Sequence, residues 1–461
     1  MASQFLVVLD ASIVSVALPA IGRDLAMTQA HLQYVVSLYA LTFGGLLVVG
    51  ARVGDRFGRA RTMRVGLVLF AAASVLCGLA SNEAVILIGR SIQGAAAALI
   101  SPTALALLTE SFPEDEARQR ALGVWGAASA AGGAAGLLLG GLLTDGPGWP
   151  WIFYVNVPVA GGLALATRLV LPRVDARSTG RFDVAGAVLL TGGLAALIQG
   201  LTAGPTSGWA DPTTVALLAG SGGGLGLFVV VQRHTVSPLV PPRVLRTGSV
   251  LAANVAGLAV AALIAGQSFF TSLYLQGSLG YSALRTGLAV LPLTLTALIA
   301  SNLAGRLMGR LGPRVVLVAS FLSMGAGFVL LARLGLDSGY VRDIVAPFLL
   351  FGAGVGGAFV AVTVAANDGV APDDTGTASG LINTSNQLGF SLGIAALVAV
   401  ATTAGRTTGD AARAAVDGYQ AAWTVAAVVA VVSAVTAHLA LRSSNRSTST
   451  AHHINERQPT Q

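Results

Sequence analysis

The residues most capable of chemistry are one acid and one base that lie inside long apolar runs. Asp10 interrupts the first run, and Arg90 interrupts the fourth, with Gln93 three positions later on the same helical face. A helix that starts near Met1 places Asp10 about 13 Å along its axis, close to the middle of a bilayer. An ionisable group at that depth is costly and normally faces a cavity or a partner. We therefore expect Asp10 to take up and release a proton and Arg90 to take part in coupling. The alternative is that both are static structural groups, with Arg90 bonded either to Asp10 or to backbone carbonyls.

A polar hairpin at residues 50–61 joins two apolar runs, and a related basic stretch recurs at residues 305–314. Glycines four residues apart allow close backbone approach, and an aspartate beside them can accept hydrogen bonds from a helix N-terminus or an arginine. We expect a latch that favours one conformation; the alternative is a basic anchor with glycines for the turn. The candidate latch residues are Gly54, Asp55, Arg56, Gly58 and Arg59.

Glycines at four-residue spacing form one face of the fifth apolar run, which is typical of tight helix packing in membranes. The residues of this face are Gly132, Gly136, Gly140 and Gly141. Other polar side chains within apolar runs are candidates for a substrate cavity, against the alternative of interhelical hydrogen bonding. These candidates are Gln93, Asn254, Gln267, Tyr274, Asn383 and Gln387.

The composition indicates a membrane protein. Of the 461 residues, 54% are hydrophobic and only 10% are charged, whereas soluble domains carry about 25% charged residues. The apolar runs are continuous rather than alternating, so we expect helices and not strands. The fourteen predicted helices are 2–22, 33–51, 63–80, 84–108, 120–143, 151–171, 184–203, 213–232, 250–276, 286–308, 314–334, 343–366, 377–402 and 418–441.

The arginines predict the orientation of these helices. All 27 basic residues are arginine, and with the N-terminus inside, 20 fall in inner loops or the tail, 6 in outer loops and Arg90 within a span. Positive charge concentrates on the cytoplasmic side of membrane proteins, so we expect both termini in the cytoplasm. This also explains the basic net charge without nucleic acid as a partner.

The repeated hairpin predicts a duplicated architecture. The first copy follows the second helix, and the second copy follows the tenth, so helices 1–6 and 9–14 should form parallel halves. The expected division is 1–172 for an N-terminal six-helix bundle, 173–249 for two inserted transmembrane helices, 250–441 for a C-terminal six-helix bundle, and 442–461 for a disordered cytoplasmic tail.

Several function classes are disfavoured by the sequence. No phosphate-binding loop of the form G-x-x-x-x-G-K-[ST] occurs, and the chain has no lysine to complete one. The histidines and the single cysteine, Cys77, do not form a set with metal-ligand spacing. We therefore expect neither an enzyme nor a metal or organic cofactor, and the energy for any transport must come from a gradient.

These stretches resemble the motifs of the major facilitator superfamily and of its fourteen-helix drug:proton antiporter branch. The hairpin 50–61 is similar to the family's loop between the second and third helices, and residues 87–94 (LIGRSIQG) are similar to its fourth-helix motif, whose arginine is linked with proton coupling. The glycines of 126–141 resemble the antiporter motif of the fifth helix, although Leu137 stands where that motif has proline. Further similar stretches are LDASIVSVALP at 9–19, GRFDVAGAVLLTGGLAALIQGL at 180–201 and ASGLINTSNQLGFSLGIA at 378–395.

The resemblance covers residues 5–441 and implies an exporter of drugs or antibiotics that works by alternating access and is driven by protons. It implies a small amphipathic substrate, and we expect a monomer in the lipid bilayer of a bacterial inner membrane. Alternatives are a symporter of the same fold that imports a small nutrient, and a membrane receptor or scaffold without transport.

Overall fold

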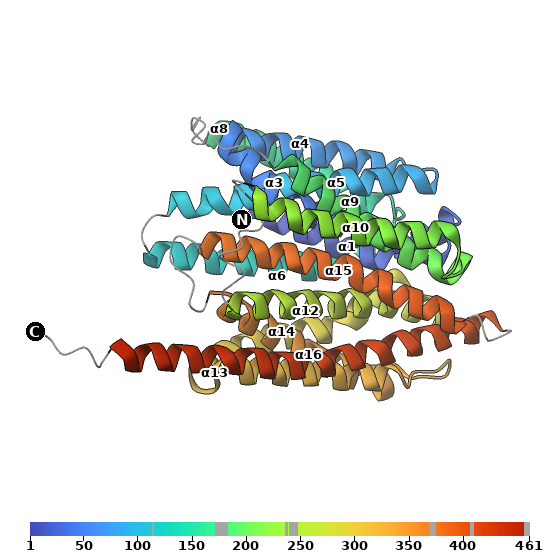
Figure 1. Cartoon of the computed structure of the whole chain (residues 1–461). Helices are drawn as coiled ribbons and strands as arrows, with labels where there is room; N and C mark the ends of the chain where they lie inside the picture. Colours follow the sequence, from blue (N-terminus) through green and yellow to red (C-terminus); the bar gives the residue numbers. More distant parts are fainter. Residues whose placement is uncertain are drawn as a thin grey trace, which may run out of the picture.

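The computed structural model describes residues 1–112, 115–170, 183–235, 238, 248–367, 375–405 and 410–455. Every regular element within these ranges is a helix, which confirms the predicted all-α class (Figure 1). The N-terminal elements are α1 (Ala2–Asp24), α2 (Gln29–Leu32), α3 (Tyr34–Phe57), α4 (Arg59–Gly78), α5 (Glu83–Ser111), α6 (Asp115–Asp145), α7 (Trp151–Tyr154) and α8 (Asn156–Val170). The middle of the chain forms α9 (Val184–Ser207) and α10 (Pro212–His234). The remaining elements are α12 (Gly248–Leu273), η1 (Tyr274–Ser278), α13 (Ala283–Leu331), η2 (Tyr340–Ile344), α14 (Val345–Asn367), α15 (Thr375–Gly405) and α16 (Ala411–Asn455).

The number of spans agrees with the prediction. Thirteen helices within the described ranges are long and apolar enough to cross a membrane. One of them, α13, is 49 residues long and bends at Gly312, whose φ of 73° is non-helical. Only glycine adopts this conformation without strain, so Gly312 divides α13 into the two spans that the sequence predicts on either side of it.

The sixth predicted helix is interrupted near its start. It divides into α7 and α8 around Val155. Pro158 explains the break, because it has no N–H to donate to the carbonyl of Tyr154 and its ring opposes a continuous helix. The interruption makes Asn156 the first residue of α8.

Helices α1–α8, which we call the first half, and helices α12–α16, which we call the second half, lie side by side. Figure 1 shows the first half in blue to teal and the second half in yellow-green to red. Helix α16 leaves the bundle at the end at which α1 begins, and it continues as a helix past Leu441 to Asn455. The predicted start of the tail at residue 442 therefore falls inside a helix, and the character of the tail itself stays a prediction.

The inserted helix α9 lies along the seam between the halves. It packs against both α3 and α15, and α10 covers it. Gln33 Nε2 donates to Thr202 Oγ1 at 2.8 Å, and the Tyr34 hydroxyl donates to Gln199 Oε1 at 2.8 Å. Toward α15 the seam is apolar, with Leu194, Ile198 and Ala395 in one buried cluster. Helix α9 thus shares an apolar cluster with both halves and is hydrogen-bonded in addition to the first half.

Hydrogen bonds join the two halves at one end of the bundle, in addition to the contact between α3 and α15. We call the end that carries residues 25–28, 146–150 and 279–282 the outer end, following the predicted orientation. There the Asp145 carboxylate accepts hydrogen bonds from the backbone N–H groups of Ala283 at 3.0 Å and Leu284 at 2.8 Å. Deeper in the bundle, Gln276 Nε2 donates to the carbonyl of Val16 at 2.7 Å. In this structure the two halves are therefore hydrogen-bonded to each other at the end that we call outer.

Candidate functional site

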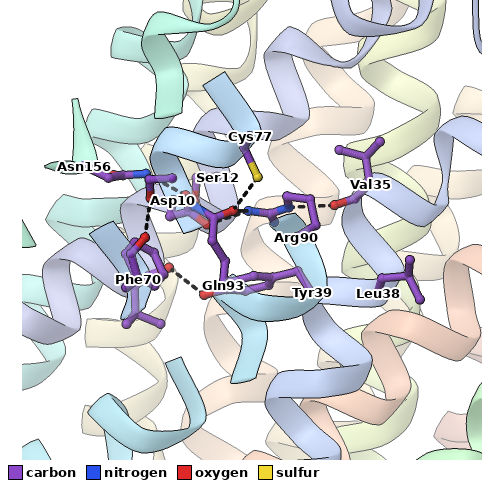
Figure 2. A network of polar contacts seen from close by, with 12 residues as sticks. Asp10, Ser12, Val35, Leu38, Tyr39, Phe70, Cys77, Arg90, Gln93 and Asn156 are labelled. Atoms are coloured by element: carbon purple, nitrogen blue, oxygen red, sulfur yellow. Dashed lines mark hydrogen bonds and ion pairs between the residues drawn. The ribbon is translucent and has the colours of Figure 1, made fainter. Parts of the chain in front are cut away.

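The candidate site is centred on an ion pair between α1 and α5. Arg90 Nη1 lies 2.7 Å from Asp10 Oδ2, and both side chains are completely buried (Figure 2). Removing two charges from water costs several kcal/mol for each ion, and only good geometry and further hydrogen bonds offset that cost. The sequence left open whether Arg90 bonds to Asp10 or to a backbone carbonyl, and the structure gives it both partners.

Asp10 receives hydrogen bonds from three side chains on two helices, α5 and α8. Besides Arg90, Gln93 Nε2 donates to Asp10 Oδ1 at 3.2 Å, and Asn156 Nδ2 donates to the same oxygen at 2.7 Å. A carboxyl group whose partners are all N–H donors is bonded as an ionised carboxylate, because a protonated one needs an acceptor. The observed arrangement therefore suits an ionised Asp10 carboxylate.

Arg90 is held by groups from α3 as well as by the acid. Its Nε donates to the carbonyl of Val35 at 2.8 Å, and its guanidinium lies 4.3 Å from the ring centroid of Tyr39. Such a cation–π contact is strengthened when water is excluded. Nη2 of Arg90 is buried and has no hydrogen-bond partner among the described residues. Nη2 of Arg90 can therefore still donate a hydrogen bond.

Gln93 connects this pair to α4. Its Oε1 accepts from Arg90 Nη1 at 2.8 Å and from the Cys77 thiol at 3.5 Å, while its Nε2 also donates to Ser74 Oγ at 2.8 Å. Both ends of the amide are used, so its orientation is fixed. Gln93 is therefore part of the buried ionic network, and whether it also contacts a substrate stays a prediction.

The glycine face of α6 supports α1 behind Asp10. A Cβ atom at Gly132 would lie 2.7 Å from the carbonyl oxygen of Phe5, and one at Gly140 would lie 2.7 Å from that of Ile13. Gly136, between them, faces Leu9. These helices can approach so closely only because the face lacks side chains. Gly141 faces Leu284 of the second half instead, so the same helix meets both halves.

The hairpin at 50–61 bonds to its own half in this conformation. Arg59 makes ion pairs with Asp55 at 2.9 Å and with Glu110 at 2.7 Å, at the inner end of α5. Gly58 has a φ of 90°, which allows the sharp turn between α3 and α4. The Arg56 guanidinium lies over the ring of Phe57. A Cβ at Gly54 would meet the side chain of Thr103 at 2.6 Å, so this glycine serves close packing on α5.

The predicted cavity residues of the second half occupy separate places. Asn254 and Gln267 are buried and bonded within that half, Asn254 to Ser385 and Gln267 to Thr271. Tyr274 lies among aromatic rings and donates its hydroxyl to the carbonyl of Gly335 at 2.6 Å.

Two candidates remain on α15. Asn383 is exposed, and Gln387 lies against Gly44 of the first half. A common substrate cavity for these residues and Asp10 therefore stays a prediction.

Three members of the network were missed in the sequence. Asn156, Ser74 and Tyr39 lie in apolar runs and carry no charge that would single them out, yet all contact Asp10, Gln93 or Arg90. The one available signal was the position of Asn156 two residues before Pro158, because a proline there interrupts the helix. The described residues contain no group of His, Cys, Asp and Glu that could hold a metal ion.

Comparisons with known proteins place these features in a family context. The family model "Major Facilitator Superfamily" matches residues 1–394. The chain is 42% identical over 445 residues to the puromycin resistance protein pur8 of Streptomyces alboniger, covering 94% of this chain and 87% of that protein. It is 39% identical over 416 residues to the cephamycin export protein CmcT of Amycolatopsis lactamdurans, covering 89% of this chain and 85% of that protein. Among solved structures, the POT family transporter PepTSo superposes with a TM-score of 0.69 at 17% identity, over 96% of this chain and 97% of that one. This likeness concerns the fold.

Proposed function

The chain belongs to the Major Facilitator Superfamily, a family of transporters rather than enzymes, and from this premise we propose that it exports a drug or antibiotic in exchange for protons by alternating access. The relatives at 42% and 39% identity are named for puromycin resistance and cephamycin export, which supports a small amphipathic antibiotic as the substrate. The family works without a cofactor, so the proton gradient supplies the energy.

The observation that carries proton coupling is the buried Asp10–Arg90 pair. Asp10 lies within the transmembrane helix α1. All its hydrogen-bond partners are donors that stabilise the ionised form. Protonation removes the charge that Arg90 neutralises and so weakens the attraction between α1 and α5. A change in packing between these helices is the link by which proton uptake could bias the two conformations.

The hairpin at 50–61 and the glycine face of α6 have further roles in the proposed transport cycle. Arg59, Asp55 and Gly58 would form a latch at the inner end, and the α1–α6 contact would keep Asp10 aligned during the movement. We propose that residues 1–172 and 250–441 move as two bundles, with residues 173–249 inserted between them. The protein would act as a monomer in the bacterial inner membrane, with both termini in the cytoplasm, as the arginine distribution suggests.

A transport assay in inside-out membrane vesicles tests this proposal. Vesicles containing the protein should accumulate puromycin, cephamycin or ethidium when a proton gradient is imposed, and should stop when the gradient is collapsed. Asp10→Asn should abolish this uptake at normal membrane abundance. The matched control is Asp24→Asn on the same helix, whose carboxylate accepts from Trp149 Nε1 at the outer end. Gradient-driven accumulation that persists in Asp10→Asn would refute the role of Asp10.

A further inference from the structure

One buried acceptor atom in the network has no hydrogen-bond partner among the described residues. Asn156 is completely buried, and its Nδ2 donates to Asp10, but its Oδ1 has no hydrogen-bond partner among the described residues. A buried acceptor left without a bond costs about 1–3 kcal/mol. Such atoms are rare in native structures, and each calls for an explanation.

Protonation of Asp10 creates a need for an acceptor. In the observed state its partners are N–H groups of Arg90, Gln93 and Asn156. A carboxyl O–H needs an acceptor, and none of these N–H groups can accept it. Arg90 has no acceptor atom at all, so it cannot receive this hydrogen bond.

Of the two amides that contact Asp10, Asn156 alone can turn without breaking other bonds. Gln93 is fixed because its oxygen accepts from Arg90 and its nitrogen donates to Ser74. Reversing it would break both bonds. Asn156 uses its nitrogen toward Asp10, while its oxygen is unbonded. A half-turn of this amide exchanges N and O in nearly the same place and costs no other hydrogen bond.

We propose that the side-chain amide of Asn156 turns over when Asp10 takes up a proton, so that Oδ1 accepts the new carboxyl O–H. The proton comes from the aqueous phase and remains on Asp10, and no covalent bond of Asn156 forms or breaks. Asn156 is thus a positioning residue that stabilises both protonation states of Asp10 in turn. The inference rests on the proposed proton coupling, and it extends the coupling site to the start of α8.

The surroundings of the pair leave few other groups that could respond. The titratable groups beside the Asp10–Arg90 pair are Tyr39 from α3 and Cys77 from α4. Helix α6 presents glycines to α1, α7 presents Phe153, and η1 meets α1 through the uncharged Gln276. Tyr39 donates to the carbonyl of Val7 at 3.5 Å, and the Cys77 thiol lies against Gln93.

Infrared difference spectroscopy of the purified full-length protein tests the inference without any substrate. Acid-minus-neutral spectra should show the carbonyl band of a protonated carboxyl group, which Asp10→Asn removes, and a side-chain amide band that changes with the same pH midpoint. Asn156→Leu should remove the amide change. Asn302→Leu on the exposed face of α13 is the matched control and should leave both bands intact.

A variant with a second carboxyl group tests how residue 156 affects the pH midpoint of Asp10. In Asn156→Asp a second carboxylate faces Asp10, and the pair then shares one proton, so the midpoint should move up by about one pH unit or more. If Asn156→Leu does not fold, Asn156→Ser replaces it, since its hydroxyl can donate or accept but cannot give an amide band. Size-exclusion profiles establish folding for each variant.

The outcomes separate the two proposals. An Asp10 band that titrates without any amide change, or an unmoved midpoint in Asn156→Asp, would overturn the role of Asn156 and leave proton binding by Asp10 standing. Absence of an Asp10 carboxyl band over the whole accessible pH range would overturn both. A paired carboxyl and amide response, lost in Asn156→Leu, would support the inference even if no transported compound has been found.

Discussion

Asp145 Oδ2 accepts a hydrogen bond from the backbone N–H of Leu284 at 2.8 Å, which joins the last turn of α6 to the first turn of α13. Asp145 Oδ1 accepts from the preceding backbone N–H, that of Ala283. A carboxylate at a helix N-terminus satisfies unpaired N–H groups and interacts favourably with the helix dipole. Because Asp145 belongs to the first half and α13 to the second half, this helix cap also holds the two halves together at the outer end.

Asp145→Ala should shift the protein away from the closed outer end. It removes two hydrogen bonds that exist only while α6 and α13 touch, and each is worth about 1 kcal/mol. Spin labels at exposed outer positions, Ser81 in the first half and Asp337 in the second, should report longer distances in the variant. Asp211→Ala is the control, because Asp211 caps α10 in the same way without joining the halves. An unchanged distance distribution would show that Asp145 does not hold this end closed.

Gly136→Ala should lower the melting temperature and the export rate, whereas Gly133→Ala should change neither strongly. A Cβ at Gly136 would lie 2.8 Å from the carbonyl oxygen of Leu9, so α1 and α6 must move apart. A Cβ at Gly133, on the same helix, would find its nearest neighbour at an ordinary 3.8 Å. Overpacking of this kind costs about 1–3 kcal/mol. Thermal unfolding in detergent and vesicle transport measure the two effects, and equal behaviour of the two variants would contradict this prediction.

Arg90→Leu should destabilise the fold more than Asp10→Asn/Arg90→Leu does. Removing the arginine alone leaves a buried carboxylate without its counter-ion, which costs about 3–5 kcal/mol. Replacing both residues removes both buried charges and leaves mainly altered packing. Melting temperatures of both single variants and the double variant, compared as a thermodynamic cycle, measure the coupling. Strictly additive changes would mean that the 2.7 Å contact contributes no interaction energy of its own.

Arg59→Ala should slow transport several-fold while leaving the melting temperature nearly unchanged. Its ion pairs with Asp55 and Glu110 are partly exposed, and such pairs contribute about 0–1 kcal/mol. A latch acts by biasing two conformations that both remain folded, so its loss should appear in the rate. Arg61→Ala removes an exposed charge from the same turn and serves as the control. If both variants slow transport equally, the effect comes from charge at the inner surface and not from the latch.

Most helix ends were predictable to within a few residues, but α16 spans Ala411–Asn455 where the sequence predicts 418–441. Apolar runs between charged loops gave fourteen spans, and the break of α13 at Gly312 falls between two predicted ones. The division of α7 from α8 was not predicted, because hydropathy is continuous across Val155 and only Pro158 signals the interruption. The two inserted helices were found as spans, but nothing in their composition indicated that α9 lies between α3 and α15.

The candidate site was predictable only for its charged members. Asp10 and Arg90 stood out because charge within an apolar run is costly, and Gln93 because it shares a helical face with Arg90. Asn383 and Tyr274 looked equally suitable for a cavity, yet Asn383 is exposed and Tyr274 bonds to Gly335 in the second half. A polar residue within a span indicates that it has a hydrogen-bond partner, but it does not identify that partner.

The sequence by itself determined the membrane class, the number of spans, the hairpins that repeat, and the presence of a buried acid and base that must be neutralised. These follow from transfer free energies that depend on residue type and on position along one helix. The tertiary structure alone decided that Arg90 reaches Asp10 across 80 positions, that Asn156 completes the site, and that α9 occupies the seam. Such contacts depend on how each helix is rotated about its axis against its neighbours, and that rotation is set by packing among helices that are distant in the chain.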